Sequence, residues 1–204
     1  MMSNFNIKFI MQILPFIATL GADDKSNISS LGVYISRSIV GPYDDNTFSD
    51  LKNLPAVGAG FSSRLWLSNL PIHVGVGLSP KIWEIKRKQG DTKKIIINKV
   101  NYVDLWTRLS FSTMNCIIFS DLNVGTYING KRFIEESDAS FQELKTITKE
   151  DVSNDAFGMD FGISFGLGYQ IDKLQVNLKY IRGLSEPSED IKFYGTVLSL
   201  GHEF

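Results

Sequence analysis

The residue types that most often carry chemistry are few in this chain. Its two histidines, His73 and His202, have no convincing nucleophile beside them, so the sequence does not indicate a Ser/His hydrolase. Asp104 and Arg108 suit acid/base work, but on a strand they are more than one side-chain repeat apart. The single cysteine, Cys116, is expected to be a buried small hydrophobe. The sequence therefore predicts no enzyme, no metal site and no cofactor.

Charged residues inside the candidate strands share one strand face. They are Arg64, Lys81, Asp104, Arg108, Asp121, Asp160, Lys179 and Glu203. Mixed positive and negative charges in a narrow interior predict salt bridges that plug it, with Arg108 paired to a carboxylate such as Asp104 or Asp160. A wet, charge-lined path for a small ion or solute is the alternative.

Glycines recur in the segment GMDFGISFGLGYQ. The segment lacks the helix and the Lys-Ser/Thr of a phosphate-binding loop, and Gly158, Gly162, Gly166 and Gly168 all fall on one strand face. These glycines are expected to leave room for bulky or charged neighbours across a sheet.

Length and charge bound the class of protein. The 204 residues contain 21 Lys and Arg against 22 Asp and Glu, so no net charge draws the chain to nucleic acid. No run of about 20 apolar residues exists, which excludes a spanning helix. Lys8 followed by the apolar stretch 9–20 predicts a signal peptide over residues 1–22, with an extra N-terminal strand as the alternative. Residues 30–204 are predicted to form one domain.

Period-2 alternation of apolar and polar residues predicts eight strands in that domain. The expected ranges are 31–39, 57–67, 72–81, 102–111, 118–128, 158–170, 174–180 and 194–204. One face is nearly all Leu, Ile, Val and Phe, and the other is Gly, Ser, Asn, Gln and charges. An eight-stranded barrel has no interior space for so many large side chains, so the apolar face is expected to point outward to lipid. The fold class is therefore all-β, an antiparallel up-and-down transmembrane β-barrel.

The connections alternate between short and long. Tight turns are expected at 69–70, 114–115 and 171–173, and long polar loops at 41–55, 87–98, 129–155 and 184–191. In outer-membrane barrels the short turns face the periplasm, which predicts periplasmic chain ends. Loop 129–155 is the longest and is acidic, so a binding function is sought there first. The basic clusters 86–88 and 93–94 are interpreted as a solvated loop, with contact to lipopolysaccharide as the alternative.

Aromatic residues near the expected strand ends suit the interfacial girdles of a membrane barrel. They are Phe111, Tyr169, Tyr180, Tyr194 and Phe204.

From about Ser30 to Phe204 the chain resembles the PorT-like outer-membrane β-barrel family of Bacteroidota. The motifs that carry the resemblance, in order, are LGVYIS, VGAGFSSRLWL, IHVGVGLSPKI, NYVDLWTRLSF, DLNVGTYINGK, DFGISFGLGYQI, LQVNLKYIRGLS and VLSLGHEF. The resemblance implies an outer-membrane location and insertion by the barrel-assembly machinery. The closing motif looks like the signal that this machinery recognises, formed by Tyr194, Leu198, Leu200 and Phe204. No catalytic or ligand-binding residue follows from the resemblance.

The expected function is a structural, adhesion or secretion-accessory role, exerted through outer loops. The expected partners are outer-membrane lipids and lipopolysaccharide, the assembly machinery and proteins at the outer loops. A narrow porin-like conduit and a soluble, lipocalin-like binder of a hydrophobic ligand are the alternatives.

Overall fold

The computed structural model describes residues 28–42, 50–67, 70–89, 92–138, 145–153, 157–188 and 191–204. The expected signal segment 1–22 lies outside these residues. The described ranges contain nine strands: β1 (Ile28–Pro42), β2 (Leu51–Leu67), β3 (Leu70–Gln89), β4 (Thr92–Thr113), β5 (Cys116–Asp138), β6 (Lys145–Val152), β7 (Met159–Ile171), β8 (Leu174–Gly183) and β9 (Phe193–Glu203). No helix among the described residues is long and apolar enough to cross a membrane.

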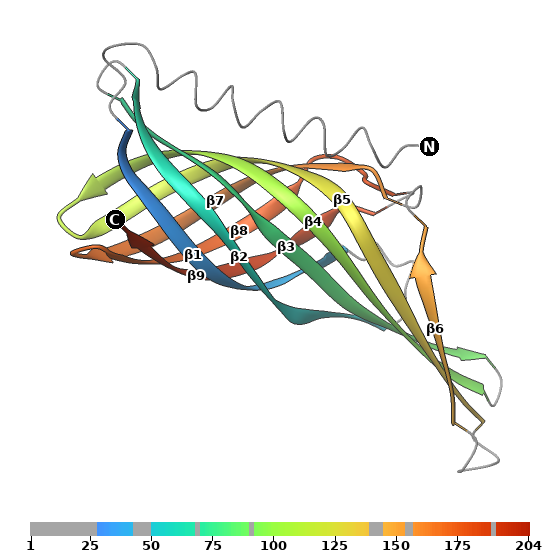
Figure 1. Ribbon diagram of the computed structural model, residues 1–204. Coiled ribbons are helices and arrows are strands. Elements are labelled where there is room, and N and C mark those ends of the chain that lie inside the picture. The colour runs from blue at the N-terminus through green and yellow to red at the C-terminus, as the bar shows by residue number, and fades with distance from the viewer. Residues whose placement is uncertain are drawn as a thin grey trace.

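Eight of the nine strands close into a ring in which every neighbouring pair is antiparallel (Figure 1). The order runs β4-β3-β2-β1-β9-β8-β7-β5, and pairing of β5 with β4 closes it. Strand β6 pairs with β5 outside the ring. The predicted eight-stranded, antiparallel up-and-down barrel is therefore confirmed, with one strand added at its side.

The strand registers define the tilt and width of the barrel. Following cross-strand partners from Ile35 through β2 and β3 reaches Val103 on β4. Following them the other way around the ring, through β9, β8, β7 and β5, reaches Thr113, ten residues further along β4. With ordinary strand spacings, a stagger of ten in eight strands gives a tilt of about 40° and a backbone radius of about 8 Å. Side chains fill an interior of that width.

Two of the predicted tight turns join strands at the end of the barrel where the C terminus lies, here called the turn end (Figure 1). Met114 and Asp172 each begin a two-residue turn with φ near +50°, which lets the strands reverse within two residues. The third predicted turn lies partly outside the described residues. Cys116, the first residue of β5, is exposed beside such a turn, so its predicted burial is wrong.

Two of the long loops predicted from the sequence are instead β-structure. Residues 87–89 and 92–98 form the paired ends of β3 and β4, as far as Gln89 and Thr92, and much of 129–155 belongs to β5 and β6. The loop prediction was wrong because charged residues are frequent in these segments and the apolar residues occur in runs, so no period-2 alternation marks a strand there.

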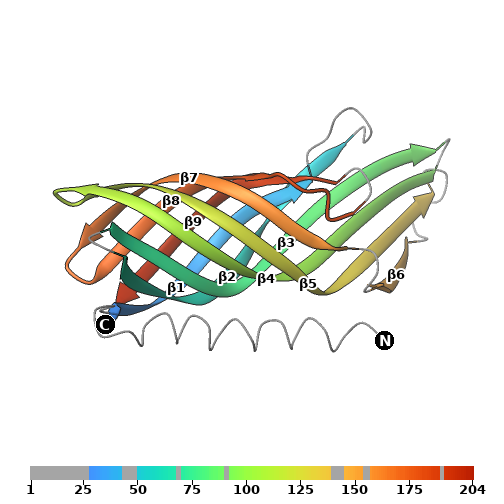
Figure 2. The ribbon, with the colours of Figure 1, turned by 90° about the horizontal axis from the view of Figure 1, so that it is seen from above.

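These strand ends project beyond the ring as a sheet at the end opposite the C terminus (Figures 1 and 2). The projecting sheet is called the blade, and its end of the barrel is the blade end. The blade comprises residues 51–54, 82–89, 92–99, 130–138 and 145–152.

The barrel carries its apolar side chains outside and its charges inside. Leu122 and Phe165 on the outer face are 62% and 60% exposed, whereas Asp121, next to Leu122 in the chain, is 0% exposed. Arg37 is an exception: it lies on the outer face between Val57 and Leu198. The outer face is therefore suited to an apolar medium.

Candidate functional site: the barrel lumen

The centre of the lumen holds a buried charge triad. Asp121 accepts hydrogen bonds from Arg108 Nε at 2.7 Å and Nη2 at 3.1 Å, and from Lys179 Nζ at 2.9 Å. The Arg108 guanidinium carbon also lies 3.5 Å from the centroid of the Phe119 ring. The sequence suggested Asp104 or Asp160 as the partner of Arg108. That suggestion is wrong, because the β4–β5 register places Asp121 directly opposite Arg108.

A second ion pair lies between the triad and the blade end. Lys81 donates to Asp160, and both side chains are largely buried. The Lys81 ammonium lies 4.1 Å from the Tyr102 ring centroid and 4.2 Å from that of Phe193, so two aromatic faces also stabilise it. This pair links the charged part of the lumen to an aromatic part.

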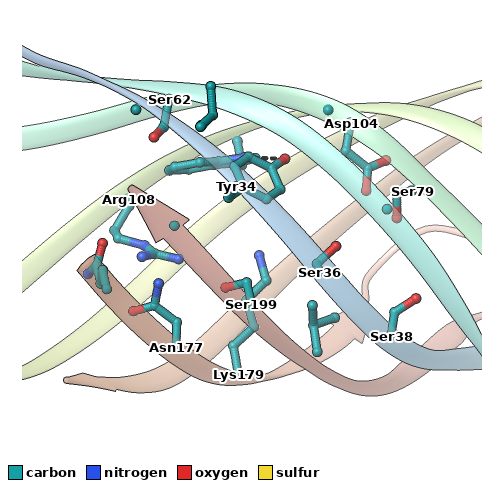
Figure 3. Close-up of a pocket in the computed structure, with 18 of the residues that line it drawn as sticks. Tyr34, Ser36, Ser38, Ser62, Ser79, Asp104, Arg108, Asn177, Lys179 and Ser199 are labelled. Atoms are coloured by element: carbon teal, nitrogen blue, oxygen red, sulfur yellow. Dashed lines mark hydrogen bonds between the residues drawn. The ribbon is translucent and has the colours of Figure 1, made fainter. Parts of the chain in front are cut away.

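A third pair lies at the turn end. Arg64 Nη2 contacts the Glu203 carboxylate oxygens at 3.1 and 3.2 Å, and Arg64 Nε donates to His73 Nε2 at 3.3 Å. The two charged side chains are 26% and 18% exposed, so water reaches this pair. Asp104 differs from the other predicted residues, since within the described residues it forms no ion pair. It lies beside Ser79 on the wall of a cavity in the lumen (Figure 3).

Five aromatic side chains close the lumen at the blade end, and they are called the aromatic plug. The plug consists of Trp83, Tyr102, Tyr127, Phe157 and Phe193, all buried. Tyr127 stacks on Phe157 with ring centroids 5.6 Å apart, and Trp83 lies 5.9 Å from Phe193. Aromatic rings packed this closely exclude water.

A small cavity with a mixed polar and apolar wall lies in the lumen (Figure 3). Its volume is about 80 Å³, and serine hydroxyls, Asn177, Lys179 and Asp104 line it. The Trp106 indole donates to Tyr34 Oη at 3.4 Å along its wall. A cavity of this size has room for roughly half a dozen water molecules, which suits hydration of the charges better than passage of a solute.

Inner-face glycines make space for the large lumen side chains. A Cβ at Gly166 would meet the Phe119 ring and lie 2.7 Å from the Leu178 carbonyl oxygen, and a Cβ at Gly168 would meet the Asn177 amide. The predicted role is therefore confirmed for Gly166 and Gly168. The same holds for Gly75, where a Cβ would overlap the Trp106 indole. The role is not confirmed for Gly158 and Gly162, where a Cβ would come nearest to the backbone carbonyl oxygens of Pro187 and Arg182, at 3.5 and 3.2 Å.

The lumen offers little to a catalytic mechanism. His73 accepts a hydrogen bond from Arg64, and the ring centroids of His202 and Phe204 lie 4.9 Å apart. Within the described part of the chain, neither histidine hydrogen-bonds to a hydroxyl or a carboxylate. No group of three His, Cys, Asp or Glu side chains suited to a metal ion occurs there either. The arrangement is chemically a set of neutralised charges.

Sequence reasoning missed the aromatic plug. Tyr102 and Tyr127 already had inner-face parity, which was the available signal. Trp83 lay beyond the expected end of its strand, and Phe157 and Phe193 lay just outside expected strands. Only the three-dimensional arrangement brings these five rings together.

Residues of the predicted assembly signal lie on the outer face of β9 and at the C terminus. Leu198, Leu200 and Phe204 are exposed, and Tyr194 lies on the same face. Recognition of this signal by the assembly machinery stays a prediction.

No protein-family model and no curated protein matches this sequence. Among solved structures, Neisserial surface protein A is 7% identical, with 89% of this chain and 100% of that chain covered and a TM-score of 0.47. The attachment invasion locus protein Ail of Yersinia pestis is 12% identical over 88% of this chain and 97% of that chain, with a TM-score of 0.39. The N-terminal β-barrel domain of Pseudomonas aeruginosa OprF is 13% identical over 85% and 97%, with a TM-score of 0.37. No residue role follows from likeness at this level, and the fold assignment rests on the strand pairing of this chain.

Proposed function

We propose that this chain is an integral outer-membrane β-barrel of a Gram-negative bacterium with a closed lumen. It anchors the blade at the cell surface, where the blade serves a structural, adhesion or secretion-accessory role. The observation that carries the proposal is the inverted polarity of the barrel, with apolar side chains outside and ion pairs inside. A closed ring satisfies its backbone hydrogen bonds internally, as a lipid environment requires.

The height of the apolar outer face supports membrane insertion. On β4 it extends from Val103 to Phe111, eight residues apart, and Asn101 follows beyond Val103. At a tilt of about 40° those eight residues span about 20 Å along the barrel axis. Outer-membrane barrels carry an apolar band of about 25 Å. The same polarity argues against a soluble, lipocalin-like binder, which would have its apolar face inside.

The lengths of the connections between strands support one orientation of the barrel in the membrane. Short turns follow β4 and β7 at the turn end, whereas the long strands project at the other end. Outer-membrane barrels keep short turns in the periplasm, so the turn end and the chain ends are assigned to that side. The aromatic residues Phe111, Tyr169 and Phe204 then lie at the periplasmic interface, where β9 would present its signal to the assembly machinery.

Closure of the lumen argues against a diffusion conduit. The aromatic plug blocks the blade end, the triad crosses the centre, and the cavity of about 80 Å³ has room for only about half a dozen water molecules. We also propose that the chain is a member of the PorT-like family, which the ordered motifs of the sequence support. The proposal includes no catalytic activity.

The test combines membrane fractionation, gel mobility and planar-bilayer conductance on the full chain. Outer-membrane recovery, a mobility shift on boiling and electrical silence are the expected results, because the folded barrel resists detergent and its lumen is filled. Recovery in the soluble fraction with no shift would refute the membrane assignment. Regular conductance steps from a correctly shifted barrel would refute the closed lumen and support the conduit.

A further inference from the structure

The outer face of the blade is strongly basic. The strand registers place the side chains of this face on the same side of the sheet as the apolar outer face of the barrel. Trp83 and Ile85 lie on the opposite side of the blade and are buried. Among the side chains that the structure describes, seven lysines share this outer face: Lys52, Lys86, Lys88, Lys93, Lys99, Lys131 and Lys149. Three carboxylates share it: Glu84, Glu135 and Asp151. The face therefore has an excess of positive charge.

The arrangement of these lysines is unfavourable for the protein alone. Lys99 and Lys131 are direct cross-strand partners, and so are Lys88 and Lys93. Like charges directly opposite one another destabilise a sheet. Within the described residues, Lys99 and Lys131 form no ion pair. Asp151 lies directly opposite Lys131 on its other side and offsets part of the repulsion. An anion held between the two ammonium groups would offset the rest.

The opposite face of the same strands is built differently. There Lys94 forms an ion pair with Glu136 at 2.6 Å, and Arg132 donates to Asn98 at 2.9 Å. Positive groups on that face already have partners. On the outer face Lys86 is also paired, with Glu84 at 3.3 Å, so that face differs in its excess of lysines over carboxylates.

The position of the Lys99–Lys131 pair indicates which anion it would meet. It follows directly after the Asn101–Asn129 pair, which itself follows the apolar residue Val103 on the same face. Four residues along a tilted strand place Lys99 about 10 Å above Val103 along the barrel axis. If Val103 marks the edge of the hydrocarbon layer, Lys99 and Lys131 lie at the level of lipid headgroups. Long lysine side chains at such a boundary extend toward the polar region.

We propose that the basic outer face of the blade binds the phosphate groups of glycolipids in the outer leaflet, with Lys99 and Lys131 as the central clamp. This inference rests on the proposed function, because it needs the barrel to be inserted with the blade outside. A phosphorylated headgroup with attached acyl chains matches the lysines at headgroup level and the apolar barrel face around Val103 below them.

The experiment uses the folded full chain in neutral detergent micelles, titrated with diphosphoryl lipid A. The test variant is Lys99→Gln with Lys131→Gln. The matched control is Lys94→Gln with Arg132→Gln, which removes two positive charges from the same two strands on the opposite face. Each lysine near an anionic surface contributes about fivefold, so the test variant should bind roughly 25-fold more weakly than the wild type. The control should bind about as tightly as the wild type.

Gel mobility before and after boiling is measured for every variant, so failure of the barrel is distinguished from failure of lipid binding. A shifted wild type that binds diphosphoryl lipid A, with loss confined to the test variant, supports the inference. Equal loss in both variants means non-specific attraction to charge and overturns it. Equally strong binding of inorganic phosphate, with no preference for the lipid, points to a small-anion site and also overturns it.

Discussion

Neutralising Asp121 should destabilise the barrel more than any other single charge change in the lumen. Asp121→Asn keeps the side-chain size but leaves Arg108 and Lys179 without their shared carboxylate. Removing one partner of a buried ion pair costs about 3–5 kcal/mol, because an uncompensated charge stays behind. With Asp121 0% exposed and Arg108 buried, the variant should fall in that range.

Other single changes to the lumen charges should destabilise the barrel less. Arg108→Leu leaves Asp121 paired with Lys179, so it should be destabilising but less so than Asp121→Asn. Glu203→Gln disrupts a pair that water reaches, so it should cost about 1 kcal/mol or less. Combining Arg108→Leu with Asp121→Asn should cost less than the sum of the single changes, because the two groups interact directly.

Equilibrium urea unfolding of the barrel in detergent or lipid vesicles measures these differences. The fraction of folded protein is read from the gel shift and from tryptophan fluorescence, since Arg108 lies 5.1 Å from the Trp106 ring centroid. With an ordinary urea dependence, the midpoint for Asp121→Asn should drop by at least about 1 M. An unchanged midpoint for Asp121→Asn would show that water hydrates the lumen charges, and the argument for a plugged lumen would fail.

Two further changes test the packing and the orientation. Gly75→Ala should destabilise the barrel by about 1–3 kcal/mol, because the new methyl group overlaps the Trp106 indole, and adding Trp106→Leu should recover part of the loss in the same urea assay. Cys116 is exposed at the turn end, so a bulky membrane-impermeant maleimide should label it only after the outer membrane is permeabilised. Moving the cysteine to the blade, with Cys116→Ser and Lys149→Cys, should allow labelling of intact cells. Labelling of Cys116 on intact cells would reverse the assigned orientation.

The alternation of residue types was enough to predict the ring. Strand β7 alternates Phe161, Ile163 and Phe165 with Gly162 and Ser164, and such a pattern defines two faces whatever the rest of the chain does. The same parity assigned the eight lumen charges to one face. Counting large side chains against the interior of an eight-stranded barrel then determined which face points outward.

Polarity along the chain was misleading at the blade. Lys93, Lys94 and the acidic residues after Gly130 suggested solvated loops, yet these segments pair as strands. A strand with both faces in water needs no apolar alternation, so its sequence looks like a loop until cross-strand partners are known. The exposure of Cys116 was missed for a related reason, since parity does not show how close a residue lies to a strand end.

The sequence by itself determined the two faces, the number of strands in the ring and the charges of the lumen, because each depends on period-2 spacing within single strands. Only the tertiary structure decided which charges pair and which aromatic rings close the lumen. Arg108 meets Asp121 through the β4–β5 register, and Trp83 meets Phe193 across the interior. Register and closure bring together residues far apart in the chain, and spacing along one strand does not contain that information.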